Sequence, residues 1–219
     1  MLSLSSVLNW FINLFQTTGN NPMRTKIKIL LISKSKNMYG CSTPASLSTG
    51  LFNSAKHVAS ALNKTLWADV KVVSVTDNND IDREVYLFKP NVVIIEALWV
   101  VPEKFDILKK LHPTVQWIVR IHSETPFLAG EGSALTWVDG YLKRGIKVAP
   151  NISSMVRDLY VCFPYHLDSI IHLPNIYDID GVPIVKYNNK RKDLHIGCFR
   201  SHTNTKKSFG PSDCCYRVC

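Results

Sequence analysis

Residues 27–33 read IKILLIS and residues 91–98 read NVVIIEAL, and these two apolar runs decide the fold of the chain. A run that is apolar at nearly every position is typical of a strand buried on both faces of a parallel sheet. Between the two runs, apolar residues recur at helical spacing from Leu51 to Leu62 and predict a helix that begins near Gly50. Strand, helix and strand in this order predict an α/β fold built on a doubly wound parallel sheet.

The sequence on either side continues the alternation of strands and helices. Asp80 and Asn151 precede two apolar helical stripes, and both residue types accept hydrogen bonds from the free N–H groups at a helix start. We therefore expect each of them to be a helix N-cap. Further strands are expected at 70–75, 115–121, 146–149 and 169–173, and further helices at 81–88, from Pro102 onward, at 133–142 and from 152 onward.

Composition is ordinary for a globular domain, with 46% hydrophobic and 20% charged residues, but the formal net charge of +9 is high. A basic chain favours anionic partners such as nucleotides, phosphorylated acceptors, nucleic acid or an acidic membrane surface. Cys41, Cys162 and Cys198 stand singly, as expected for a protein of the reducing cytoplasm.

The N-terminal stretch carries an apolar segment at residues 7–15 (VLNWFINLF), which is too short for a membrane span and lacks the basic flank of a signal peptide. Met23 stands directly before the first strand and is a candidate for the true start, which makes residues 1–22 an extension. The alternative is an interfacial helix with weak contact to a membrane surface.

Chemistry in open α/β sheets is found beyond the carboxyl ends of the strands, and the loop that follows the first strand lies there. Residues 38–50 (MYGCSTPASLSTG) place Gly40, Ser42 and Thr43 ahead of a helix N-terminus, where backbone N–H groups can hold an anion or a sugar hydroxyl. The loop has neither the Walker A nor the GxGxxG spacing. A binding loop and a plain surface loop both remain open from this feature.

Two further strand ends carry ionisable residues. Glu96 closes an otherwise apolar strand, so it must be either exposed in a cleft, with Trp99 as a wall, or paired. His122 and Glu124 follow the fourth strand, and His122 is a candidate base or hydrogen-bond partner for an acceptor hydroxyl, with Glu124 near enough to orient it or to bind sugar. A structural role for His122 is the alternative.

The end of the chain changes character. Leu194, Ile196 and Cys198 alternate with His195 and Gly197, which predicts one more buried strand at 193–199. Residues 200–219 show no helical or strand period and contain half of the six cysteines. Codons permitted by these residues, read one base later, can spell GAIRTLKNHLAQAIAAIEFA, a glycine turn followed by a helix. We expect a disordered, frameshifted tail, with a natural disordered tail as the alternative.

Several segments together resemble glycosyltransferases of family four, particularly the short forms of bacteriophage and related bacterial genomes. The resemblance spans about residues 24–199 and rests on the combination of motifs. They are IVRIHSETPF, DNNDIDREV, NVVIIEALWVVPEKF, HLPNIY and HIGCF.

The resemblance implies a two-lobed GT-B enzyme in which Rossmann-like lobes face a cleft. The first lobe receives a sugar or another hydroxyl acceptor, and the second holds the nucleotide-sugar donor, with no metal or other cofactor. Gly40 and its loop would line the cleft, His122 would be catalytic or contact the acceptor, and Asn175 would mark the passage between lobes.

The resemblance also implies a division of the chain and a missing part. Residues 1–22 are an N-terminal extension, 23–177 the acceptor lobe, 178–192 the interlobe linker, 193–199 the first strand of a truncated donor lobe, and 200–219 the tail. Arg200, Lys206 and Lys207 do not match the residues that grip the donor diphosphate, so we expect a glycosyltransferase that is inactive alone.

Two other readings compete with this one. The first is a non-catalytic α/β module that binds a nucleotide or a protein through its basic surface. The second is a zinc site in a tail that binds nucleic acid, and its spacing fits no common zinc module. We expect neither a metal nor a nucleic-acid partner. The residues of that zinc site would be Cys198, His202, Cys214, Cys215 and Cys219.

Overall fold

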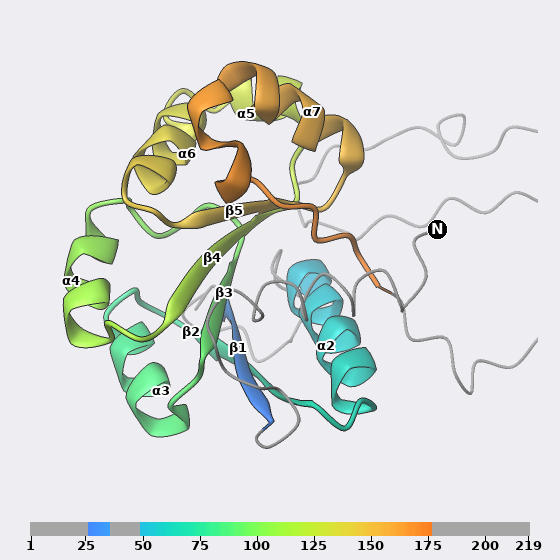
Figure 1. Cartoon of the computed structure of the whole chain (residues 1–219), viewed down its shortest axis with the longest axis vertical. Coiled ribbons are helices and arrows are strands. Elements are labelled where there is room, and N and C mark those ends of the chain that lie inside the picture. The colour runs from blue at the N-terminus through green and yellow to red at the C-terminus, as the bar shows by residue number, and fades with distance from the viewer. Residues whose placement is uncertain (1–25, 36–48, 177–219) are drawn as a thin grey trace, which may run out of the picture. The chain divides into compact units, whose positions relative to one another are not determined.

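The computed structural model describes residues 26–35 and 49–176 (Figure 1). The predicted extension 1–22, the binding-loop residues Gly40, Ser42 and Thr43, and everything expected after residue 176 lie outside these ranges. The predictions for the linker, the strand at 193–199, the tail and its cysteines therefore stay predictions.

Five parallel strands form the sheet and confirm the predicted α/β, doubly wound architecture. Their order is β2-β1-β3-β4-β5, and every neighbouring pair is parallel. The two apolar runs become β1 and β3, which pair with each other in the middle of the sheet. The strands are β1 (Ile27–Lys34), β2 (Ala68–Val75), β3 (Val92–Glu96), β4 (Gln116–Ile121) and β5 (Lys147–Pro150).

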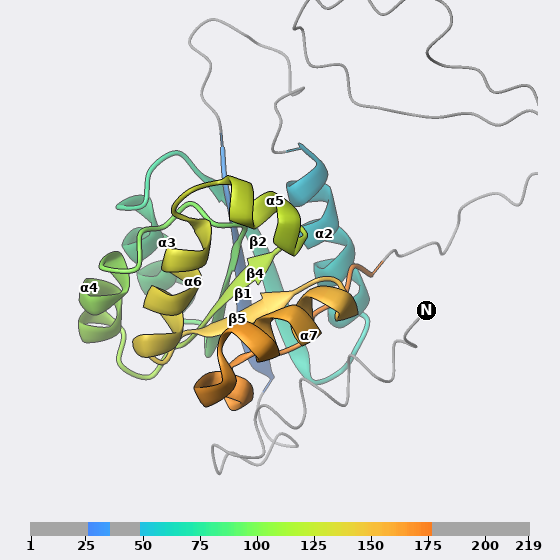
Figure 2. The same ribbon diagram turned by 90° about the horizontal axis from the view of Figure 1, so that it is seen from above.

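Helices cover both faces of the sheet. One face is covered by α2 (Thr49–Asn63) together with the extended residues 171–176, and α3, α4 and α6 lie on the opposite side (Figures 1 and 2). In the described ranges, no helix combines the length and the apolar character needed to cross a bilayer. The remaining helices are α3 (Asp80–Phe88), α4 (Lys104–Leu111), α5 (Thr125–Gly130), α6 (Ala134–Lys143), α7 (Ser153–Cys162) and a 3₁₀ turn, η1 (Pro164–Ser169).

Alternate residues of the central strands pack into two separate hydrophobic cores, one on each face of the sheet. Leu30 and Ile32 of β1 point to the face shared with α3 to α7, whereas Ile29 and Leu31 point to the face under α2. Successive strand residues face opposite sides of a sheet, so a strand that is apolar at both parities serves both cores. Phe105 stands in the larger core and is completely buried.

Three local predictions need correction. The residue before α3 is Asn79, and Asp80 is the first residue of the helix, where its carboxylate accepts from the Asp77 N–H at 3.3 Å. Ile152, not Asn151, is the N-cap residue of α7. The strand expected at 169–173 is a single bridge between Ile170 and Val148, because η1 occupies the chain up to Ser169.

Gly140 marks a tight contact between α6 and the turn that precedes α4. A Cβ atom at this position would lie 2.8 Å from Cγ and 2.9 Å from Cβ of Pro102. We expect Gly140→Ala to lower the free energy of unfolding by about 1–3 kcal/mol, since overpacking outweighs the gain in helix propensity. Gly130→Ala is the matched control, because nothing lies within 4 Å of its Cβ position. Urea denaturation of both variants checks the prediction, and equal stabilities would contradict it.

Tyr141 of α6 gives the fold a dependence on alkaline pH. Burial, with a smaller contribution from the charge of Glu103, raises the pKa of this phenol well above its usual value. The folded state therefore holds the Tyr141 proton more tightly than the unfolded state does. The stabilisation that results is fully present below about pH 10 and is lost as the pH rises further. We expect a slope of up to about 1.4 kcal/mol per pH unit there.

The variant Tyr141→Phe tests this dependence. It should lose about 1 kcal/mol at neutral pH, because the hydroxyl donates to the Val100 carbonyl. Above pH 10 its stability should fall less steeply than that of the wild type. Thermal melts between pH 8 and pH 11 measure both effects, and parallel pH curves would contradict the assignment to Tyr141.

Candidate active site

Three polar side chains stand in one row across the carboxyl ends of the central strands. Glu96 of β3 pairs in register with Arg120 of β4, and Ser33 of β1 follows Ile32, which pairs with Ile95. Paired residues of parallel strands point to the same face, here the face under α2. All three residues are buried. The apolar sheet thus ends in a polar row at the edge where ligands bind in open α/β folds.

Glu96 and Arg120 form a buried ion pair. Both side chains are completely buried, and Arg120 Nη1 lies 3.2 Å from Glu96 Oε1. Removing two charges from water is costly unless each is paired and its remaining hydrogen-bonding atoms are satisfied. The expectation that Glu96 is either paired or exposed in a cleft resolves in favour of pairing.

The other nitrogens of the Arg120 guanidinium bind residues 173–175, the segment that follows η1. Nε donates to the Leu173 carbonyl at 3.2 Å, and Nη2 donates to the Pro174 carbonyl at 2.9 Å and to Asn175 Oδ1 at 2.8 Å. Ser54 of α2 donates to the same Asn175 oxygen at 3.0 Å. One arginine therefore joins β4, β3 and residues 173–175.

His122 is bonded to the other oxygen of Glu96. Its Nε2 lies 2.6 Å from Glu96 Oε2, and its side chain keeps 13% of its surface exposed. A carboxylate that accepts from Nε2–H fixes the ring and its tautomer, and the lone pair then resides on Nδ1. The carboxylate that orients His122 is thus Glu96. Glu124 is exposed at the N-cap of α5, and its role toward substrate stays a prediction.

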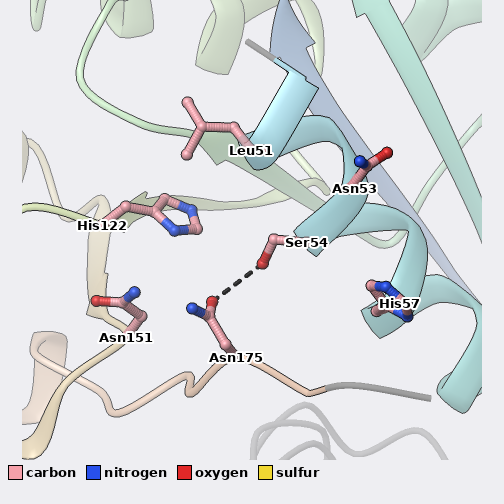
Figure 3. A pocket seen from close by; sticks show the side chains of 8 residues that line it. Leu51, Asn53, Ser54, His57, His122, Asn151 and Asn175 are labelled. Atoms are coloured by element: carbon pink, nitrogen blue, oxygen red, sulfur yellow. Dashed lines mark hydrogen bonds between the residues drawn. The ribbon is translucent and has the colours of Figure 1, made fainter. Parts of the chain in front are cut away.

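A pocket opens beside this pair, with a volume of about 590 Å³. Figure 3 shows His122, Asn151 and Asn175 around one side and the first turns of α2 on the other. The side chains that line it are amides, a hydroxyl, imidazoles and one leucine, so Glu96 and Arg120 lie beneath the pocket and not in it. The lining residues are Gly50, Leu51, Asn53, Ser54, His57, His122, Asn151 and Asn175.

The backbone immediately after Glu96 is strained. Ala97 has a φ of 71°, in the left-handed region that side chains other than glycine rarely adopt. Its N–H donates to the Arg120 carbonyl at 2.9 Å, which continues the β3–β4 ladder past the end of β3. Strain of this kind persists only where surrounding contacts hold it, and it is frequent at functional sites.

Comparison of the chain with protein-family models, with curated proteins and with solved structures finds no match. Within residues 26–35 and 49–176, no group of three or more His, Cys, Asp or Glu side chains is arranged to hold a metal ion.

The structure brings together three of the residues singled out from the sequence, namely Glu96, His122 and Asn175. Trp99 is not a wall of the pocket. Its indole N–H donates to the Glu96 carbonyl at 3.0 Å, and its ring packs against the larger core on the other face.

Sequence reasoning missed Arg120, Ser54 and Asn151 as parts of the site. A signal for Arg120 was present, since it is the single charge in the strand sequence QWIVRI and lies two residues before His122. Asn151 was assigned to helix capping, yet its side chain lines the pocket, and its Oδ1 is buried without a hydrogen-bond partner in the described part of the chain.

Proposed function

We propose that this chain provides the acceptor-binding lobe of a glycosyltransferase, an enzyme that moves a sugar from a nucleotide-sugar to an acceptor hydroxyl. The observation that carries the proposal is the His122–Glu96 pair, joined at 2.6 Å, at the rim of a pocket at the carboxyl edge of a parallel sheet. A histidine oriented by a buried carboxylate is the usual arrangement for taking a proton from a hydroxyl. Three of the cysteines, Cys41, Cys162 and Cys198, stand singly and far apart, which supports a cytoplasmic location for the reaction.

The chemistry follows from the tautomer. With Nε2–H donating to Glu96, the lone pair on Nδ1 accepts the hydrogen bond of an acceptor hydroxyl. As the hydroxyl oxygen forms its bond to the anomeric carbon of the donor sugar, the bond to the nucleotide phosphate breaks and Nδ1 takes the proton. The Glu96 carboxylate stabilises the imidazolium ion that results.

The neighbouring amides suit a ligand rich in hydroxyl groups. Asn175 Oδ1 already accepts from Arg120 and Ser54, so among the described residues its NH₂ group remains to donate to a ligand oxygen. Asn53 and Asn151 add further amides to the same lining. A hydroxyl group both donates and accepts, which matches an imidazole lone pair beside amide donors.

Ligand binding tests the proposal. We expect monosaccharides such as glucose, galactose, mannose and N-acetylglucosamine, added in turn, to shift the NMR signals of His122 and of the Asn175 side chain. The variant His122→Phe should weaken that binding about tenfold, the loss expected for one hydrogen bond. His112→Phe is the matched control, since His112 also contacts a carboxylate, Asp82, at 2.7 Å but does not line the pocket.

The competing function is a module that binds nucleotides or proteins without catalysis. The specific observation in its favour is the first turn of α2 in the pocket, because a helix N-terminus attracts phosphate. UDP and GDP are the probes for this alternative. Shifts at Gly50 to Asn53 with either nucleotide, and none with any sugar, would replace the proposed function by this one.

A further inference from the structure

Arg120 occupies a position that the proposed chemistry does not use directly. Its side chain is completely buried, and it donates to Glu96 on one side and to three acceptors in residues 173–175 on the other. The planar guanidinium donates through fixed directions, so its partners cannot shift independently without breaking a hydrogen bond.

Glu96 transmits this constraint to His122. One carboxylate oxygen accepts from Arg120 and the other is bonded to the imidazole, so rotation of the carboxylate changes both contacts. A carboxylate is rigid and planar, and the orientation of an imidazole is set by the hydrogen bond of its second nitrogen. Residues 173–175 are therefore connected to the His122 ring by hydrogen bonds through two side chains, Arg120 and Glu96.

We propose that Arg120 is a positioning residue that couples residues 173–175 to the orientation and tautomer of His122. When the segment lies against the sheet, Arg120 holds Glu96 in place and the lone pair of His122 stays on Nδ1. When the segment is displaced, Arg120 and Glu96 relax and His122 samples its second tautomer. The coupling itself needs only this geometry, and its consequence for transfer rests on the proposed function.

The segment has built-in reporters of its position. The N–H of Ile171 donates to the Val148 carbonyl at 2.9 Å, and the N–H of Leu173 donates to the Pro150 carbonyl at 3.0 Å. Amide hydrogen exchange at these two residues measures how often the segment leaves β5. Nitrogen NMR shifts of the His122 ring distinguish the two tautomers, so both ends of the coupling can be followed in the full chain without any ligand.

The variant Asn175→Ala tests the coupling, because it loosens the segment without touching His122 or Glu96 directly. We expect exchange at Ile171 and Leu173 to accelerate at least about tenfold, because the variant loses the hydrogen bonds that Asn175 accepts from Arg120 and from Ser54. We expect a second His122 tautomer to appear in the same sample. Arg120→Lys, which cannot reproduce the fork of contacts, should have a larger effect on both readings if it folds.

Arg144→Lys is the matched control for the arginine replacement. Arg144 also combines a carboxylate partner, Asp106 at 3.1 Å, with a carbonyl partner, Gly140 at 3.1 Å, but it lies outside the pocket. It should change neither reading.

The proposal fails if Asn175→Ala speeds exchange while the His122 signals stay as in the wild type, because Arg120 would then only fasten the segment. It also fails if Asn175→Ala leaves exchange unchanged. Since no sugar or nucleotide is present, either result is independent of the test of the proposed function.

Discussion

Replacing Phe105 by alanine should lower the free energy of unfolding by about 3–5 kcal/mol. The ring is completely buried in the larger core. It meets Trp117 edge to face with 5.7 Å between centroids, and Tyr141 in the same way at 5.5 Å. Its removal loses the transfer free energy of the ring and the aromatic contacts, and it leaves a cavity among rigid neighbours. Urea denaturation followed by tryptophan fluorescence and by circular dichroism measures the loss.

Phe127→Ala is the control for this prediction. Phe127 is also a helical phenylalanine, but 60% of its surface is exposed. A surface truncation of this kind usually changes stability by less than about 0.5 kcal/mol. Similar losses for the two variants would mean that Phe105 does not anchor α4 to the sheet as the structure indicates.

Much of the fold follows from the sequence because the central strands are buried on both faces. A strand such as IKILLIS has no polar face, and only the middle of a covered parallel sheet accommodates it. The helix expected from Pro102 onward is α4, and its residues Phe105 and Leu108 are completely buried. Leu111 is 55% exposed, because the helix ends at this residue and the core lies beneath its earlier turns.

The site was only partly predictable, because its contacts join residues far apart in the chain. The position of His122 after a strand indicated a role at the sheet edge, and Glu96 stood out as a charge at the end of an apolar strand. The sequence around His122 does not show which carboxylate contacts the histidine. That contact depends on the pairing of β3 with β4, which places Glu96 beside Arg120. The short spacing between His122 and Glu124 does not reveal the contact with Glu96, and a role of Glu124 toward substrate stays a prediction.

The capping predictions failed for a related cause. Asn and Asp favour helix starts, yet both also satisfy turns and pockets, and propensity does not distinguish these uses. Asn151 was available as an N-cap, but α7 begins two residues later at Ser153, and the amide side chain lines the pocket instead. The residue predicted to be a helix cap, Asn151, is therefore a candidate ligand contact in the folded protein.

The buried ion pair gives the second large prediction. Glu96→Leu should lower the free energy of unfolding by about 3–5 kcal/mol, because it leaves the Arg120 charge buried without its counter-charge. Arg120→Met should cost about as much, since it removes the positive partner of the Glu96 carboxylate and the donor to the Leu173 and Pro174 carbonyls. Glu103→Gln is the control. The Glu103 side chain is 69% exposed and lies 3.6 Å from Arg144, so a loss of about 0–1 kcal/mol is expected.

The double variant decides whether the pair acts as a unit. The Glu96→Leu, Arg120→Met double variant replaces both charged side chains by apolar ones of similar size, so no buried charge is left without its partner. Its loss in free energy of unfolding should therefore be smaller than the sum of the two single losses by about 2 kcal/mol or more. Recovery should be incomplete, because the Leu173 and Pro174 carbonyls lose their donor in any variant without Arg120. If the single losses simply add, the two charges do not depend on each other. In that case Glu96 would be held by His122, and the histidine, not the arginine, would be the group that keeps a carboxylate beneath the pocket.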